Sequence, residues 1–305
     1  MQRALLKLFF IVVLLLPILE LTGLFAQNAG NINSLEQELE KSLVQGESDS
    51  VINALLFVIF NHYKNNEWGK SVKTAKQGIS LFKTKNFEYC QFWYENLGFL
   101  YLKHDIYQLA LNTYYEGFSV GKNSGKPIGV CYNNLARVYL AQNLNLNKAE
   151  KLLLKAIEEH KKLPEKREQS SQLAYSYNQL GIVYERQKKH ESALDFYKKA
   201  LDVRNKINDV SGLVNSFYTI AYYYNTIYEY DSAIVYFNKG LKINKNQSYQ
   251  ISLLINRAIA FAYNNNFHLA HDDIDIALKI ANQKSSFDQC RVYKYQSQYS
   301  KLKET

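Results

Sequence analysis

Apolar and aromatic residues recur along most of this chain at helical spacing. In the clearest stretch, Tyr177, Leu180, Gly181 and Tyr184 are followed, after a polar interval, by the set Ala193, Tyr197 and Ala200. Residues three and four apart share one face of a helix, so each set forms a stripe on its own helix. The pattern predicts two amphipathic helices joined by a short turn.

The same pattern occurs six times. Its small second-helix residue recurs at intervals of 37 to 44 residues, at Ser71, Ala110, Ala149, Ala193, Ala233 and Ala270. The copy that contains Ala149 requires one extra residue in the turn, around Asn145. Repetition at intervals of about this length is typical of a chain built from stacked helix pairs.

These residues and their spacing resemble the tetratricopeptide repeat, a helix-turn-helix unit of about 34 residues. The resemblance covers roughly residues 50 to 282, although the proline that usually ends the second helix is missing throughout. It implies an all-α, right-handed α-solenoid of about six extended repeats, over residues 49–285. The longer spacing is similar to that in exported bacterial sensor and regulator proteins with this repeat.

The two ends of the chain differ from the repeats. Residues 1–26 contain a basic start, an apolar run from Leu8 to Leu19 and a small residue, Ala26, before Gln27, which predicts a cleaved signal peptide. We therefore expect a periplasmic or secreted protein, and membrane association only if the leader is retained. Residues 27–48 read as a polar spacer with one short helix. Residues 286–305 predict a capping helix or a truncated seventh repeat.

Composition excludes several classes of protein. With 47% hydrophobic residues the chain is too apolar to be disordered. The net charge of +9 could attract nucleic acid or anionic lipid, but the lysines alternate with acidic residues, which disfavours a continuous phosphate-binding track. Three scattered cysteines, Cys90, Cys131 and Cys290, do not make a disulfide framework.

No motif for catalysis or for a cofactor is present in the sequence. A glycine-rich phosphate loop, G-x-S-x-G and H-E-x-x-H are all missing. The best candidate for metal ligands is His268, His271 and Asp275, which we interpret as a solvent-facing set because Ala270 and Ile274 mark the packed side of the helix. We therefore expect no enzyme activity, no cofactor and no small-molecule substrate.

The resemblance instead implies a binding groove lined by first helices. The lining that the phasing predicts is aromatic and amide-rich, and it suits an extended peptide or a partner helix. Its candidate residues are Phe92, Glu95, Phe99, Asn133, Arg137, Tyr175, Asn178, Tyr218, Tyr222 and Asn225.

Three functions remain open at this point. The first is a non-enzymatic scaffold that binds a protein or peptide partner outside the cytoplasm. The second is the sensory input region of a signal-transduction system, either a histidine kinase or a transcription regulator, without its output module. The third is a basic binder of nucleic acid or anionic lipid.

Overall fold

The structure, a computed structural model, describes residues 55, 58–59, 61–63, 65–82, 87–123, 127–163, 167–283 and 292–293. The predicted signal peptide and polar spacer therefore lie outside the described residues, as does most of the predicted C-terminal helix. The described residues fall into two compact units, which meet in sequence between residues 163 and 167. We call them the N-terminal unit and the C-terminal unit.

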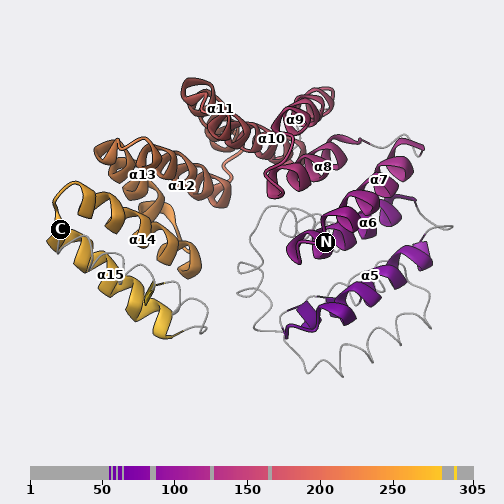
Figure 1. The fold of residues 1–305 in the computed structure, drawn as a ribbon, viewed down its shortest axis with the longest axis horizontal. Coiled ribbons are helices and arrows are strands. Elements are labelled where there is room, and N and C mark those ends of the chain that lie inside the picture. Colours follow the sequence, from indigo (N-terminus) through magenta and orange to yellow (C-terminus); the bar gives the residue numbers. More distant parts are fainter. Residues whose placement is uncertain are drawn as a thin grey trace. The chain divides into compact units, whose positions relative to one another are not determined.

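Within each unit, helices that follow one another in the chain pack together, as Figure 1 shows. The N-terminal unit contains α5 (Trp68–Phe82), α6 (Phe87–Lys103), α7 (Tyr107–Asn123), α8 (Gly129–Ala141) and α9 (Leu146–Lys161). The C-terminal unit contains α10 (Arg167–Arg186), α11 (His190–Lys206), α12 (Val210–Thr226), α13 (Tyr230–Ile243), α14 (Gln247–Tyr263) and α15 (Phe267–Asn282). The all-α repeat architecture predicted from the sequence is confirmed.

Most of the described turns between helices share one backbone geometry. At the end of α6, Asp105 has a φ of 58°, its N–H donates to the carbonyl of Leu102, and the N–H of Ile106 donates to the carbonyl of Tyr101. This Schellman motif satisfies carbonyls that the helix end would leave unpaired. The left-handed residues with this pattern are Asn66, Asp105, Asn143, Lys188, Asn208, Tyr228 and Asn265.

The turn between α8 and α9 is longer than the other turns within helix pairs. Residues 142–145 connect these helices, whereas residues 187–189 connect α10 and α11. Asn145 is itself left-handed, with a φ of 54°, and its side chain accepts a hydrogen bond from the N–H of Lys148. The extra turn residue predicted around Asn145 is thus confirmed, and it serves as the N-cap of α9.

Paired helices pack by placing an aromatic ring against a glycine. The ring of Tyr197 on α11 lies directly over Gly181 on α10, where an added Cβ would overlap it. Tyr114 lies over Gly98 in the same way, and Trp93, the largest fully buried side chain, lies over Gly78 of the preceding helix α5. Ala193 and Ala200 on α11 are completely buried. Small residues therefore set the distance between the helices, as the sequence predicts.

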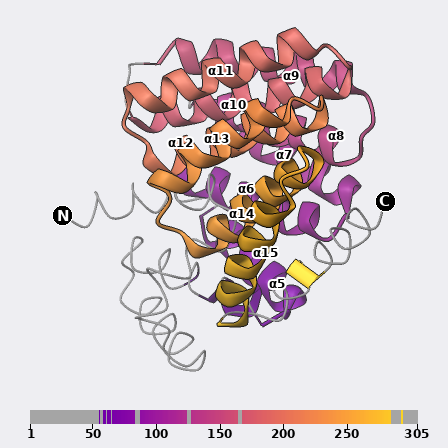
Figure 2. The ribbon, with the colours of Figure 1, turned by 90° about the vertical axis from the view of Figure 1, so that its left-hand side faces the viewer.

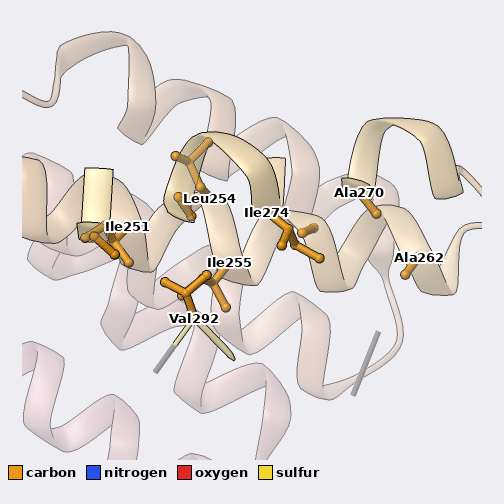
Figure 3. Close-up of a cluster of buried hydrophobic side chains, with 10 residues drawn as sticks. Ile251, Leu254, Ile255, Ala262, Ala270, Ile274 and Val292 are labelled. Carbon is orange, nitrogen blue, oxygen red and sulfur yellow. The ribbon is translucent and has the colours of Figure 1, made fainter. Parts of the chain in front are cut away.

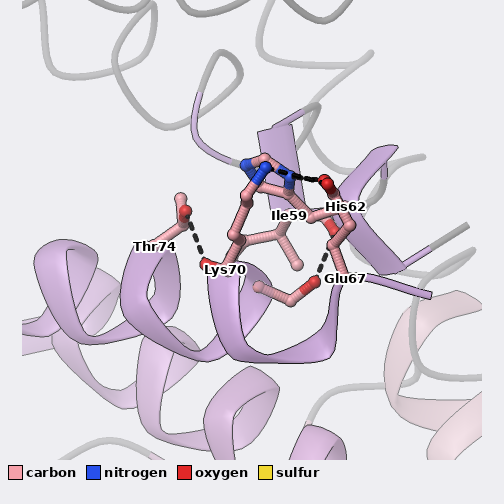
Figure 4. Close-up of polar contacts among 6 residues, drawn as sticks. Ile59, His62, Glu67, Lys70 and Thr74 are labelled. Atoms are coloured by element: carbon pink, nitrogen blue, oxygen red, sulfur yellow. Dashed lines mark hydrogen bonds and ion pairs between the residues drawn. The ribbon is translucent and has the colours of Figure 1, made fainter. Parts of the chain in front are cut away.

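The first described turn combines burial with ion pairing (Figure 4). The buried His62 lies 2.8 Å from the carboxylate of Glu67, which also accepts a hydrogen bond from Lys70 at 2.8 Å. Figure 4 also shows the Thr74 hydroxyl donating to the carbonyl of Lys70, at 3.0 Å. These contacts tie the beginning of α5 to the helix before it.

The C-terminal unit ends in a hydrophobic cluster between α14 and α15, which lie side by side in Figure 2. Val292 is fully buried in this cluster and packs near Ile251 and Ile255 (Figure 3). One charged pair is buried beside it, because both Nε and Nη2 of Arg257 donate to the carboxylate of Asp273, at 2.8 and 2.6 Å. This bidentate ion pair offsets the free-energy cost of burying the Asp273 carboxylate.

His160 is a buried titratable side chain of the N-terminal unit. Its ring lies against Gly129, its Nε2 is 3.4 Å from the Asn133 amide, and its Nδ1 has no hydrogen-bond partner. Burial lowers the pKa of His160 from 6.5 to about 4. The neutral ring is therefore the form that the fold accommodates.

Substitution of Gly181 tests the helix-pair packing. Gly181→Leu is expected to destabilise the chain by roughly 1–3 kcal/mol, because the new side chain would overlap the Tyr197 ring. Gly69→Ala is the matched control, since no atom lies within 4 Å of a Cβ added there. Urea unfolding measures both effects, and equal midpoints for the two variants would contradict this packing.

The left-handed turn residues predict a stabilising substitution. Lys188 adopts a φ of 60° on an exposed turn, a conformation that suits Asn or Gly better than Lys. Lys188→Asn is therefore expected to raise the free energy of unfolding by up to about 1 kcal/mol. A thermal melt would show this, and a clear loss of stability would argue against the turn geometry.

Burial of His160 predicts acid sensitivity. The unfolded chain binds a proton at this side chain below a pH near 6.5, whereas the folded chain resists protonation until a pH of about 4. The free energy of unfolding should therefore fall as pH drops through this window, by at most roughly 3 kcal/mol from this residue. His160→Phe should lose that contribution. If the stability difference between parent and variant did not change with pH, the acid sensitivity would not come from His160.

Candidate functional site: the groove face of the C-terminal unit

The first helices of the C-terminal helix pairs, α10, α12 and α14, present an outward face that we call the groove face. Ile182, Tyr222 and Ile259 occupy the same repeat position on these three helices, and we call them the central row. Tyr222 is 45% exposed, and the two isoleucines are partly exposed. The central row is therefore apolar, uncharged and accessible.

Tyr222 is supported by a second tyrosine one turn earlier. The rings of Tyr218 and Tyr222 stack with centroids 6.2 Å apart, and Tyr218 meets the buried Phe237 edge-on at 6.3 Å. The Tyr218 hydroxyl accepts a hydrogen bond from the amide of Asn256 on α14, at 3.3 Å. Tyr222 is thus the solvent-exposed end of an aromatic cluster whose other end, Phe237, is buried in the core.

Amide side chains join α12 to α14. Asn225 donates to the backbone carbonyl of Asn256 at 3.0 Å, and Asn215 donates to the hydroxyl of Tyr249 at 3.0 Å. The side-chain oxygen of Asn225 is buried and has no hydrogen-bond partner. The amides therefore fix the spacing of the two helices and leave an acceptor unused.

A buried arginine orients this amide network. Arg204 of α11 donates from Nη1 to Asn215 at 3.1 Å and to Ser216 at 2.7 Å. Burial lowers the pKa of Arg204, and the charge of Asp209 opposes that effect. Because Arg204 uses the carbonyl oxygen of Asn215, the NH2 group of this amide is turned toward Tyr249.

The Glu185 carboxylate of α10 is engaged within the C-terminal unit. The hydroxyl of Tyr197 donates to Glu185 at 2.5 Å. Burial, and then the Glu185 charge, raise the pKa of Tyr197, so the phenol keeps its proton and remains a donor. This contact ties Glu185 to the α10–α11 packing.

Several predicted groove residues are not accessible. Phe92, Glu95, Asn133 and Asn178 are each buried, and Tyr175 is partly buried. The oxygen of the Asn178 amide lies in the interior without a hydrogen-bond partner. The buried side chains contribute to packing in the interior, and Asn133 faces the His160 ring of α9.

Phe99 and Arg137 lie together in the N-terminal unit. The Arg137 guanidinium is 5.4 Å from the Phe99 ring centroid and donates to the Tyr114 hydroxyl at 2.7 Å. Lys103 lies over the same Phe99 ring at 5.6 Å, and burial followed by the charge of Arg137 lowers the pKa of Lys103. The sequence phasing does not predict this cationic cluster, although it places Phe99 and Arg137 on one face.

The histidines of α15 do not converge on a metal site. His268 lies 3.3 Å from Asp272, and His271 lies 3.3 Å from Asp275, as two separate pairs on the helix surface. In the described ranges, no three side chains of the metal-ligating types come together. Asp273, which sequence reasoning overlooked, points inward to Arg257 instead.

The described helices lack the character of membrane spans. None of them combines the length and the apolar character that crossing a bilayer requires. The leader, on which the predicted export depends, lies outside the described residues.

Comparison with known proteins identifies the repeats. A family profile described as tetratricopeptide repeat matches residues 128–206 and 172–246. Among curated relatives, the uncharacterized protein ycf37 of Cyanophora paradoxa is 41% identical over 69 residues. That match covers 23% of this chain and 36% of ycf37, so it spans only about a third of the relative's length.

Solved structures share the fold at low identity. BtubC from P. vanneervenii superposes with a TM-score of 0.61 at 17% identity, covering 71% of this chain and 91% of BtubC. The quorum sensor NprR from B. thuringiensis, in its apo form, gives 0.60 at 14%, covering 88% and 81%. A Rap protein complexed with competence and sporulation factor gives 0.60 at 14%, covering 89% and 80%.

The family match, the helix pairs and the glycine-to-ring packing agree with one another. The profile covers repeats from both units, and the structural likenesses extend over most of the described residues. Residues 128–246 of this chain match the tetratricopeptide-repeat family, and the described helices on either side of that range continue the same helical packing.

Proposed function

We propose that this protein is a non-enzymatic scaffold that binds a peptide or protein segment on the groove face of the C-terminal unit. The observation that carries the proposal is the Tyr218–Tyr222 stack, whose outer ring is 45% exposed while its inner ring is fixed by Asn256. A rigid aromatic side chain with one open face is typical of residues that dominate binding energy at interfaces.

The chemistry of the central row defines the partner. Ile182, Tyr222 and Ile259 carry no charge, and the nearby Glu185 carboxylate is engaged by Tyr197. We expect the bound segment to contribute apolar side chains to this row. The amides of Asn215 and Asn225 are engaged by α14, so apolar contacts supply most of the binding energy on this row.

The structural likenesses support a peptide ligand. NprR has also been solved in complex with its cognate peptide NprX, and that structure gives a TM-score of 0.57 at 13% identity, covering 90% of this chain and 85% of NprR. The Rap structure likewise contains competence and sporulation factor. By analogy with the quorum sensor, a sensory input role is the second candidate.

We further propose that the protein acts outside the cytoplasm, because residues 1–26 have the features of a signal peptide.

A general polyanion-binding surface receives less support. Lys162 pairs with Glu158 and Glu159, Lys199 pairs with Asp195, and Lys70 pairs with Glu67. These contacts place carboxylates beside the lysines, which weakens attraction to phosphate groups.

Selection of displayed random peptides on the full chain tests the proposed function. The selected peptides should be rich in apolar residues, and Tyr222→Ala should weaken their binding by about tenfold or more, as expected for a central aromatic anchor. Tyr115→Ala is the control, because Tyr115 is similarly exposed but lies on α7. Selected peptides that bind Tyr222→Ala as tightly as the parent would contradict the groove assignment.

A further inference from the structure

A second exposed surface lies at the turn between α12 and α13. It shares no residue with the central row, and it carries acidic residues beside its aromatic rings. Tyr228 is 77% exposed at this turn, and its ring meets that of Tyr230 edge-on, with centroids 6.4 Å apart. Tyr230 stacks in parallel on Tyr263, at 5.3 Å and 6°, and Tyr263 is 50% exposed. We call Tyr228, Glu229, Tyr230, Asp231 and Tyr263 the turn patch.

Two features of Tyr228 oppose folding. Its φ of 64° is left-handed, a conformation that a bulky side chain adopts at a cost, and Asn occupies the same turn position at Asn66, Asn143 and Asn265. Its aromatic ring is also left mostly in water. Backbone strain and aromatic exposure at one residue point to a role outside the packing of the fold.

The turn patch is acidic in an otherwise basic chain. Residues 207–238 contain no lysine or arginine, although the net charge of the chain is +9. Glu229 and Asp231 are exposed, and neither forms an ion pair with any residue that the structure describes. Asp231 accepts one hydrogen bond, from the Asn264 amide at 2.7 Å, which leaves its other oxygen available.

The corresponding turn of the preceding helix pair is basic. It carries Lys188 and Lys189, and the Lys189 ammonium lies over the Tyr184 ring at 5.3 Å. The turn patch is acidic, whereas the turn with Lys188 and Lys189 is basic. A cationic ligand would therefore be attracted to the turn patch and repelled by the basic turn. Lys188 also occupies the same left-handed turn position as Tyr228.

We propose that the turn patch binds an arginine-bearing segment of a partner protein. Tyrosine faces attract guanidinium groups through the ring quadrupole, and carboxylates beside the rings add charge-assisted hydrogen bonds. This chain already uses the same chemistry internally, since Arg137 lies over Phe99 and Arg257 lies over Phe261. The proposal is independent of the groove face, because no residue of the turn patch belongs to the central row.

A labelled peptide of alternating glycine and arginine tests the proposal against the full chain. Fluorescence anisotropy should show saturable binding that weakens with added salt, and a peptide with citrulline in place of arginine should not bind. Tyr228→Asn should weaken binding by about fivefold, because it removes one cation–π contact while keeping a residue suited to the turn. Glu229→Gln should also weaken it.

Lys188→Asn is the matched control, since it changes the same turn position in the preceding repeat. It should leave arginine-peptide binding equal or slightly stronger. Tyr222→Ala should leave it unchanged, which separates this proposal from the groove function. Equal binding of the citrulline peptide, or no effect of Tyr228→Asn, would overturn the proposal. Self-association in sedimentation that Tyr228→Asn abolishes would overturn it too, because a second copy would then be the occupant.

Discussion

The packing of an aromatic ring against a glycine controls the rest of this structure. Tyr197 can cover Gly181 only because no Cβ intervenes, and the two helix backbones approach accordingly. The same close approach brings the Tyr197 hydroxyl within reach of Glu185, so one contact satisfies a buried phenol and also engages a groove-side carboxylate. The spacing of α10 and α11 and the engagement of Glu185 both depend on this contact.

The sequence predicts the repeat because its signals are local. Gly181, Ala193 and Tyr197 have fixed spacing, and helical periodicity alone assigns them to one interface. The burial of Arg204, Asp273 and His160 has no such signal. Their partners lie on the helix before or after them in the chain, and only the three-dimensional packing brings Arg204 to Asn215 or Asp273 to Arg257.

In the candidate site too, the sequence predicts the contacts within one helix but not those between helices. Phasing correctly places Tyr218 and Tyr222 on one face, since they are four residues apart on a single helix. It cannot show how closely α12 approaches α14, and that distance decides which positions remain in contact with solvent. Asn133 and Asn178 are buried, whereas Asn256, which phasing does not single out, supports Tyr218 through a hydrogen bond.

The order of contacts has a consequence for how the chain loses structure. In the C-terminal unit each helix packs mainly on the helices next to it in sequence, from α10·α11 through α14·α15, with α12·α14 as a step across one pair. Stability in such an arrangement is a sum of repeat and nearest-neighbour terms, so individual pairs can open without unfolding the whole unit. Amides in one helix pair can thus exchange with solvent water while those of another pair stay protected. Local opening of this kind is a low-energy route by which a groove formed by stacked helices can admit a ligand.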